Sequence, residues 1–264
     1  VAAARLAEAI AGTGVRSSQA ATGRANLFAK SVGVVQIDAQ LINAFNAINP
    51  MITVATIPPF CRTSPDMMIA TIKIISYAVP EADVAQACRV ALDAIAVLPP
   101  LFSKATLIET QIGDVPSDKG RKALGGRLDR LGITLGPRVI VPHTCAALAY
   151  AIAEANEEAV FILTASATSD LDDVGPAAVR ASGGDITQFG MPVDPGNLLF
   201  LGQHDQKPVI GLPGCARSPA LNGADWVLER VMCGVQLTPA DFAAMGVGGL
   251  LKEIPTRPKP RADI

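Results

Sequence analysis

Two segments of this 264-residue chain combine residue types that could bind or transform an anionic ligand. The first is the loop 165–173, which holds serines, a threonine and three aspartates directly after an apolar run. Hydroxyls beside carboxylates suit Mg²⁺ or the hydroxyl groups of a phosphorylated ligand. We therefore expect Ser166, Ser169 and Asp172 to lie at a site, whereas Asp173 has a simpler interpretation as the N-cap of the next helix.

The second segment, GLPGCARSPALNGADWVLERV at 211–231, looks like an anion-binding loop. Gly211 and Gly214 surround a strand end, and Arg217 comes just before Ser218, which is expected to cap a helix whose first residue is Pro219. Free N–H groups at a helix start and a guanidinium together favour an anion. The alternative is a well-capped helix beside an exposed arginine. Neither GxxxxGK[ST] nor GxGxxG is present, which excludes the P-loop and Rossmann interpretations.

His143 follows an apolar run in the sequence PHT, where a ligand-facing edge is expected, although a lone histidine is more often structural. No G-x-S-x-G elbow supports hydrolase chemistry. Cys215 is either a small loop residue or a nucleophile whose pKa a helix start would lower, and the lack of a dedicated base favours the first interpretation. The five cysteines form no CxxC pair, which indicates a reduced, cytoplasmic protein and argues against disulfides or structural zinc.

The elements that must position these residues alternate regularly after about residue 105. Apolar strands are expected at 106–110, 138–141, 159–164, 186–191, 198–201 and 208–212, and helices at 119–131, 144–155, 174–181 and 219–231. This pattern is typical of an α/β fold, a three-layer αβα arrangement around a mostly parallel sheet, with an antiparallel hairpin at or near one edge. Ligands of such sheets bind beyond the carboxyl ends of the strands.

The chain before residue 105 has a different character. Helices are expected at 1–10, 38–48 and 81–97, and strands at 51–57 and 68–77, which indicates a smaller α+β region. Glycines are absent from 34–112, and nineteen of the 23 lie in 113–264. We therefore divide the chain into 1–104, 105–234 and a tail or linker at 235–264, which ends in the proline-rich PTRPKPRADI.

Composition excludes several classes of protein. Half of the residues are hydrophobic and 17% are charged, which argues against intrinsic disorder. A net charge of −2 and 4% aromatic residues offer neither a basic footprint nor stacking platforms for nucleic acid. No apolar stretch reaches the roughly 18 residues that a membrane span needs.

Four motifs in residues 105–234 resemble those of one family. GLPGCARSPA stands where the family carries GLPGNPVSA, PVDPGNLLFLG where it has a MKPGKP segment, and LTASATSDLDDV where it has TSGGVSVGDYD; Gly113 and Asp114 fall near its GDE motif. The region resembles the molybdopterin-binding domain of molybdenum cofactor biosynthesis proteins, the molybdopterin molybdotransferase and adenylyltransferase group. The sequence is also similar to a bacterial branch of this family, in which the molybdopterin-binding region precedes a nucleotidyltransferase domain.

The resemblance implies that the protein binds molybdopterin or its adenylylated form. It places Asp114 and Asp172 as catalytic residues that hold Mg²⁺ or polarise a leaving group, and it adds Gly196 and Asn197 to the ligand-binding residues. It also implies Mg²⁺-assisted cleavage of the adenylylated pterin with insertion of molybdate, and a homo-oligomeric protein.

Departures from the family pattern leave two functions open. The TSGG glycines are replaced at 165–167, Asn197 stands in place of a lysine, and Val115 in place of the GDE glutamate. These changes favour a non-catalytic binding or carrier module that serves a fused nucleotidyltransferase domain, whereas the retained Asp114 and Asp172 favour an enzyme. A third reading is an unrelated sugar-phosphate or nucleotide enzyme on the same fold.

Overall fold

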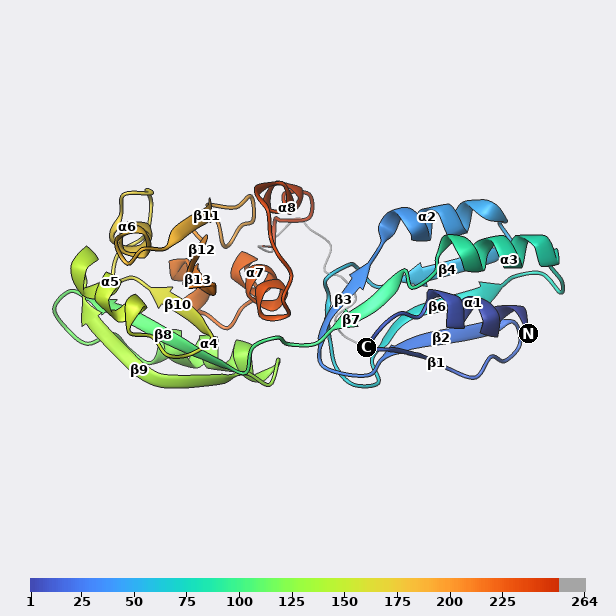
Figure 1. Cartoon of the computed structure of the whole chain (residues 1–264), viewed down its shortest axis with the longest axis horizontal. Helices are drawn as coiled ribbons and strands as arrows, with labels where there is room; N and C mark the ends of the chain where they lie inside the picture. Colours follow the sequence, from blue (N-terminus) through green and yellow to red (C-terminus); the bar gives the residue numbers. More distant parts are fainter. Residues whose placement is uncertain (252–264) are drawn as a thin grey trace, which may run out of the picture. The chain divides into compact units, whose positions relative to one another are not determined.

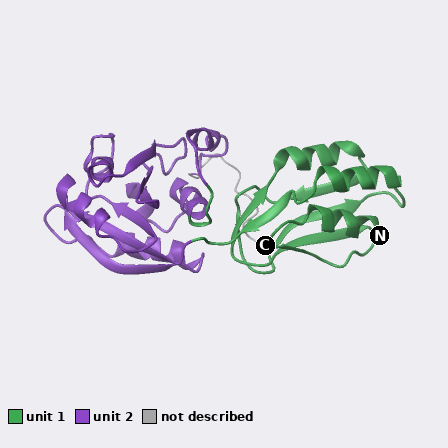
Figure 2. Cartoon of the chain, in the orientation of Figure 1, with its two compact units in different colours: residues 1–101, 232–235 green, residues 102–231, 236–264 purple. Residues whose placement is uncertain are grey.

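The structure is a computed structural model, which describes residues 1–251. It divides into two compact units: residues 1–101 with 232–235, and residues 102–231 with the chain from 236 onward (Figure 2). The division at 104 and 234 proposed from the sequence stays a prediction, because compactness alone does not show which segments fold independently. The predicted proline-rich tail at 255–264 lies outside the described residues.

The first unit is an α+β arrangement of three helices and two antiparallel sheets (Figure 1). The four-stranded sheet has the order β1-β2-β6-β4, and the three-stranded sheet the order β5-β3-β7. Its elements are α1 (Ala2–Ile10), β1 (Val15–Ser17), β2 (Arg24–Ala29), β3 (Gly33–Ile37), α2 (Ala39–Ile48), β4 (Ile52–Thr56), β5 (Arg62–Thr63), β6 (Met68–Ile74), α3 (Glu81–Val90) and β7 (Ile95–Leu98).

The predicted helix at 81–97 is wrong in its second half. Helix α3 ends at Val90, and Ile95–Leu98 forms strand β7, whose Ile95 pairs with Ile37 of β3. Between them Asp93 adopts a positive φ of 55°, which turns the chain. The alternating β-branched residues of this segment suit a half-buried strand, and pairing with a distant strand overrides the helical spacing.

The second unit is built on a six-stranded sheet with the order β11-β12-β13-β10-β8-β9. Strands β13, β10, β8 and β9 are mutually parallel, whereas β12 runs antiparallel to both of its neighbours and lies beside the edge strand β11. The strands are β8 (Lys104–Gln111), β9 (Thr134–Pro142), β10 (Ala159–Leu163), β11 (Asp185–Phe189), β12 (Phe200–His204) and β13 (Lys207–Gly211). The predicted mostly parallel sheet with a hairpin near its edge is confirmed.

Helices cover both faces of this sheet, as predicted. Helices α5 (Cys145–Ala153) and α6 (Val174–Ala181) pack together over one face, where Val160 and Ile162 of β10 join their core. On the opposite face, Leu163 of β10 lies against Gly120 of α4 (Lys119–Asp129). Helix α7 (Gly223–Met232) is tied to α4 by a buried ion pair, and α8 (Pro239–Ala244) follows it.

The predicted start of the helix at Pro219 is wrong. A short 3₁₀ helix, η1 (Gly214–Arg217), is followed by an irregular segment, and α7 begins only at Gly223. Asn222 caps α7, since its Oδ1 accepts the N–H of Ala224 at 2.8 Å. Pro219 is therefore not the first residue of a helix, and Ser218 is not its N-cap.

Across residues 1–251, the helices are all too short or too polar to span a membrane.

Candidate functional site

Four loops meet at one edge of the second unit's sheet. Because β8, β9, β10 and β13 are parallel, their carboxyl ends lie on the same side, and each continues into a loop there. The loops are 112–118, 143–144, 164–173 and 212–222. Every candidate residue except Gly196 and Asn197 lies in one of these loops or at the end of one of these strands.

A pocket of about 630 Å³ opens between α4 and the loop after β13. We call it the basic pocket, because three cationic side chains line it: Lys119 and Lys122 from the first turn of α4, and Arg217 from η1. The remaining lining residues are Ala123, Gly214, Cys215, Ser218 and Pro219. Gly214, Arg217 and Ser218, predicted together as an anion site, thus lie around one cavity.

The helix terminus that was predicted at Ser218 does not contribute to this pocket, whose cationic groups are the side chains of Lys119, Lys122 and Arg217. Ser218, at the end of η1, accepts the N–H of Ala220 with its Oγ at 3.2 Å, a local turn contact. Arg217 is half-buried, and its Nη2 donates to the carbonyl oxygen of Thr164 at 2.7 Å. That bond fixes the guanidinium against the end of β10.

A buried arginine on α4 shapes the loop that carries the pocket. Arg127 donates to three carbonyl oxygens of this loop, those of Ala216 at 2.9 Å, Ser218 at 2.9 Å and Ala220 at 3.1 Å. Its Nε also donates to Asp225 at 2.9 Å, with both side chains less than 5% exposed. Arg127 therefore satisfies carbonyl groups that the irregular backbone leaves without helical partners.

The loop after β8 is held by a second ion-pair network. Arg138 of β9 donates to buried Glu109 at 2.8 Å and to Asp118 at 2.8 Å, and it also bonds the carbonyl oxygen of Pro116. The hydrogen bond and charge of Glu109 raise the pKa of Arg138. Asp114 lies in this loop with an exposed side chain.

His143 connects the ends of three strands. Its Nδ1 lies 2.8 Å from Oγ1 of Thr110 at the end of β8, and its Nε2 lies 3.0 Å from Oγ of Ser166 in the loop after β10. The Thr110 hydroxyl also accepts the N–H of Ala165 at 2.8 Å. Two predicted residues, His143 and Ser166, are thereby brought into direct contact.

The aspartates after β10 serve the loop itself. Asp173 precedes α6 at its N-cap position, but its Oδ2 accepts the N–H groups of Ser169 at 2.6 Å and Asp170 at 3.0 Å rather than those of the helix. Asp172 is 92% exposed and pairs with Arg180 at 2.9 Å. Ser169 thus has its backbone engaged in the loop, while Asp172 has a cationic partner.

The predicted magnesium site finds no matching donor set. In residues 1–251 there is no group of three or more His, Cys, Asp or Glu side chains that could hold a metal ion. Asp172 already pairs with an arginine, and the neighbouring carboxylates of its loop bond backbone N–H groups. These residues do not fit a resident Mg²⁺ ion.

Two of the predicted glycines have packing roles. A Cβ at Gly211 would lie 1.9 Å from the Phe200 ring, and one at Gly196, whose φ is +139°, would lie 2.7 Å from the backbone nitrogen of Gly223. Both glycines are buried. Asn197 is exposed, and its carbonyl oxygen accepts the N–H of Met191 at 3.0 Å in the turn before β12. Only Gly214 lines the basic pocket.

The environment of Cys215 disfavours its thiolate form. Desolvation by neighbouring atoms raises the pKa of its thiol, although part of the residue is exposed on the pocket wall. The lowering that a helix start would cause is wrong, because no α-helix begins at this residue and desolvation, with the charge of Asp194, outweighs the opposing effects of backbone hydrogen bonds and Arg127.

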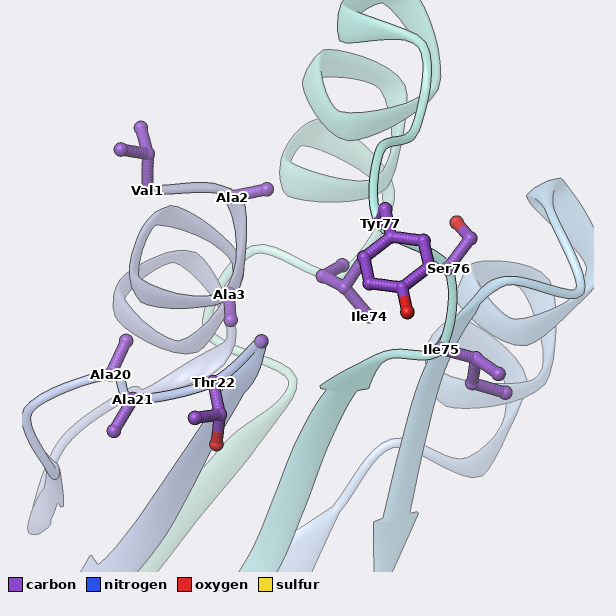
Figure 3. Close-up of a pocket in the computed structure, with 11 residues that line it drawn as sticks. Val1, Ala2, Ala3, Ala20, Ala21, Thr22, Ile74, Ile75, Ser76 and Tyr77 are labelled. Atoms are coloured by element: carbon purple, nitrogen blue, oxygen red, sulfur yellow. The ribbon is translucent and has the colours of Figure 1, made fainter.

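A further pocket, of about 510 Å³, lies in the first unit. It is lined by the first turn of α1, the turn before β2, and the segment after β6 that ends at Tyr77 (Figure 3). Its lining side chains are those of Ala, Val, Ile, Thr, Ser and Tyr, so no lining side chain carries a carboxylate, imidazole, ammonium or guanidinium group.

Sequence reasoning missed Lys119, Lys122, Thr110 and Arg127. For the lysines a signal existed: cations in the first turn of a helix are disfavoured by the helix dipole, so two of them there indicate another role. Thr110 and Arg127 gave no such signal, because their partners lie 33 or more residues away in the chain.

No protein-family model matches the sequence, and no curated protein matches it well enough to count as a relative. Among solved structures, the molybdopterin biosynthesis protein MoeA from Pyrococcus horikoshii is 15% identical, with 89% of this chain and 78% of that chain covered and a TM-score of 0.39. Molybdenum cofactor biosynthesis protein B is 15% identical over 51% of this chain and 95% of that chain, with a TM-score of 0.37. A molybdenum cofactor biosynthesis protein from Pyrococcus furiosus is 14% identical over 92% and 70%, with a TM-score of 0.28. All three scores lie below 0.5.

Proposed function

We propose that this protein takes part in molybdenum cofactor biosynthesis by binding molybdopterin or its adenylylated form in the second unit. The observation that carries the proposal is the basic pocket, which Lys119 and Lys122 of α4 line together with Arg217 of the loop GLPGCARSPA. This loop is one of the motifs that resemble the molybdopterin-binding family. A pocket of about 630 Å³ whose lining combines apolar Ala123 and Pro219 with cationic side chains suits a phosphorylated heterocycle.

Within the pocket we assign the terminal phosphate to Arg217, Lys119 and Lys122. The guanidinium of Arg217 is pre-oriented by its bond to Thr164, and the two lysines line the same pocket from the first turn of α4. Gly214 leaves the backbone accessible at this wall, since a Cβ there would have only the Arg217 side chain within 4 Å, at 3.6 Å. Charge-assisted hydrogen bonds of this kind are the strong ones in phosphate recognition.

We assign binding rather than catalysis as the primary role. Asp172 is paired with Arg180, and the carboxylates around it do not assemble a metal site. A module that binds the pterin and serves a nucleotidyltransferase activity, on the same or another chain, agrees with these observations. The competing proposal is a molybdotransferase-like enzyme that inserts molybdate, and the exposed carboxylate of Asp114 is the feature that favours it.

A two-step assay with the purified full chain distinguishes these functions. Molybdopterin is titrated first, and binding is followed by its absorbance and by calorimetry. The adenylylated pterin is then supplied with molybdate and Mg²⁺, and release of AMP is measured. We expect binding without turnover; turnover would establish the enzyme, and the absence of binding would reject both proposals in favour of an unrelated ligand.

Substitutions in the pocket test the assigned phosphate position. Arg217→Ala should weaken binding of the pterin phosphate by roughly 1.5–3 kcal/mol, the range for hydrogen bonds to charged groups. Lys122→Ala should weaken it less, by up to about 1 kcal/mol, because the lysine is exposed to solvent. Lys104→Ala is the matched control, since Lys104 begins β8 and so lies at the opposite edge of the sheet. If Arg217→Ala and Lys104→Ala weakened binding equally, the phosphate would not bind in this pocket.

A further inference from the structure

We infer that Thr110, His143 and Ser166 form a directional hydrogen-bond chain that presents the Ser166 hydroxyl hydrogen to an oxyanion of the bound ligand. In this chain His143 is a positioning residue and Ser166 is the ligand donor. The anionic character of the ligand rests on the proposed function, whereas the direction of the chain rests only on the hydrogen bonds described above.

The chain starts from a group that can only donate. The backbone N–H of Ala165 donates to Oγ1 of Thr110 at 2.8 Å. Thr110 is 1% exposed, so its own hydroxyl hydrogen needs an acceptor within the protein. Among the residues that the structure describes, Nδ1 of His143 at 2.8 Å is the acceptor in reach.

This start fixes the tautomer of the histidine. When Nδ1 accepts from Thr110, a neutral imidazole carries its hydrogen on Nε2. Nε2–H then donates to Oγ of Ser166 at 3.0 Å. A hydroxyl that accepts a hydrogen bond keeps its own hydrogen free to donate, so Ser166, which is exposed, offers that hydrogen outward.

The opposite direction would make Ser166 a nucleophile. Its hydroxyl would then donate to Nε2, and Nδ1–H would donate to Thr110. That arrangement gives Oγ1 of Thr110 two incoming donors and leaves its own buried hydrogen without an acceptor in the described part of the chain. An unsatisfied buried donor is costly, so the hydrogen bonds from Thr110 to Ser166 favour Ser166 as a donor and not as an attacking group.

The surroundings of Ser166 select an anionic acceptor. Two residues earlier, the carbonyl oxygen of Thr164 accepts Nη2 of Arg217 at 2.7 Å, which brings a cation of the basic pocket to the same loop. The Thr164 hydroxyl in turn donates to the carbonyl oxygen of Ser166 at 2.7 Å and fixes the loop locally. A donor hydroxyl and a guanidinium attached to one short segment suit phosphate oxygens.

The tautomer can be measured directly, because the chain contains only two histidines. Long-range ¹H–¹⁵N NMR correlations of uniformly labelled protein at a pH where both are neutral distinguish Nε2–H from Nδ1–H. His204 is the internal reference, since its Nε2 contacts the carbonyl oxygen of Ser182 at 2.9 Å and must donate. The variant His143→Gln assigns the signals. We expect both histidines as Nε2–H; an Nδ1–H tautomer of His143 would overturn the inference.

The donor role is tested with inorganic pyrophosphate as the probe. Ser166→Ala should weaken pyrophosphate binding about ten-fold or more, and His143→Ala should weaken it similarly. Because His143 acts through Ser166, the double variant should lose no more than either single variant, whereas independent contributions would multiply. Multiplying losses, or unchanged affinity in Ser166→Ala, would contradict the inference. Protein that binds pyrophosphate through Ser166 but not molybdopterin would keep this inference and reject the proposed function.

Discussion

At the scale of single residues, Cys215 shows how a pocket can carry a cysteine without using its chemistry. Burial raises the pKa of its thiol, so a smaller fraction is thiolate at neutral pH than in a free thiol. We predict that Cys215 reacts with iodoacetamide more slowly than glutathione at neutral pH, and that its rate continues to rise at more alkaline pH. Mass spectrometry of the labelled peptide, read against glutathione in the same tube, measures both; faster labelling than glutathione would indicate an activated nucleophile.

Gly211 and Gly214 belong to one motif, but only Gly211 lacks the space for a side chain. A Cβ at Gly211 would collide with the fully buried Phe200 ring, whereas at Gly214 the nearest atom is Nη1 of Arg217 at an ordinary 3.6 Å. Gly211→Ala should therefore lower the free energy of unfolding by about 1–3 kcal/mol through overpacking, and Gly214→Ala should stay within about 0.5 kcal/mol. Urea unfolding of both variants tests this. A stable Gly211→Ala variant would mean that the ring moves aside.

At the scale of elements, the buried pair of Arg127 and Asp225 decides where α7 begins. Arg127 of α4 occupies the carbonyl groups of Ala216, Ser218 and Ala220, while Asp225 also accepts the N–H of Asn222 at 2.9 Å. These bonds satisfy polar backbone groups of the irregular segment before α7, so that this segment does not need helical hydrogen bonds. The segment 219–222, which the sequence predicts to be the first turn of a helix, is therefore irregular, and its Pro219 lines the basic pocket.

We predict that Arg127→Leu lowers the free energy of unfolding by about 3–5 kcal/mol, because it removes the buried partner of Asp225 and leaves that buried carboxylate with only the half-exposed Arg130. Arg130→Leu is the matched control: Arg130 contacts the same carboxylate at 3.3 Å, but its side chain is 41% exposed, and its loss should cost at most about 1 kcal/mol. Urea unfolding monitored by fluorescence gives both values. Equal effects would show that the pair contributes no more than a surface ion pair.

The contrast between local and distant contacts also explains which elements the sequence could predict. The helix after Asp38 was placed correctly because its start depends on neighbours: the Asp38 carboxylate accepts the N–H groups of Gln40 and Leu41, both at 3.0 Å. The start of α7 was misplaced because Pro219 and Ser218 have the types of a helix start, while the deciding contact comes from Arg127, about 90 residues earlier in the chain.

The candidate site follows the same rule. The position of the candidate site at the carboxyl ends of the parallel strands could be predicted, because the alternation of strands and helices places all four loops there. Arg217 and Ser218 were found from their motif, and both line the pocket. The lysines of α4 left a signal in their unfavourable place in the first turn of a helix, but which loop they lie against depends on packing. The hydrogen bonds that link Thr110, His143 and Ser166 could not be predicted, since they depend on contacts between neighbouring strands.

At the scale of the whole molecule, each unit has a hydrophobic core of its own. The core cluster of the first unit includes Phe45, Leu27 and Ile72, all buried completely. The cluster in the second unit includes Phe200 and Ile162. Neither cluster contains residues of the other unit, so the loss of packing in one should not reach the other through shared side chains.

A single tryptophan makes this separation measurable. Trp226 is the only tryptophan of the sequence and lies in the second unit, on α7, so its fluorescence follows that unit, whereas far-ultraviolet circular dichroism follows both. We predict that Phe45→Ala lowers the stability of the first unit by about 3–5 kcal/mol, the range for deleting a buried aromatic side chain. The dichroism should then show an earlier transition while the midpoint of Trp226 fluorescence stays in place. In Arg127→Leu the midpoint of Trp226 fluorescence should fall, and the dichroism, which reports both units, should show an earlier transition as well. If the Trp226 midpoint instead fell together with the dichroism in Phe45→Ala, the two units would unfold as one cooperative body, because a two-state transition has a single midpoint for every probe.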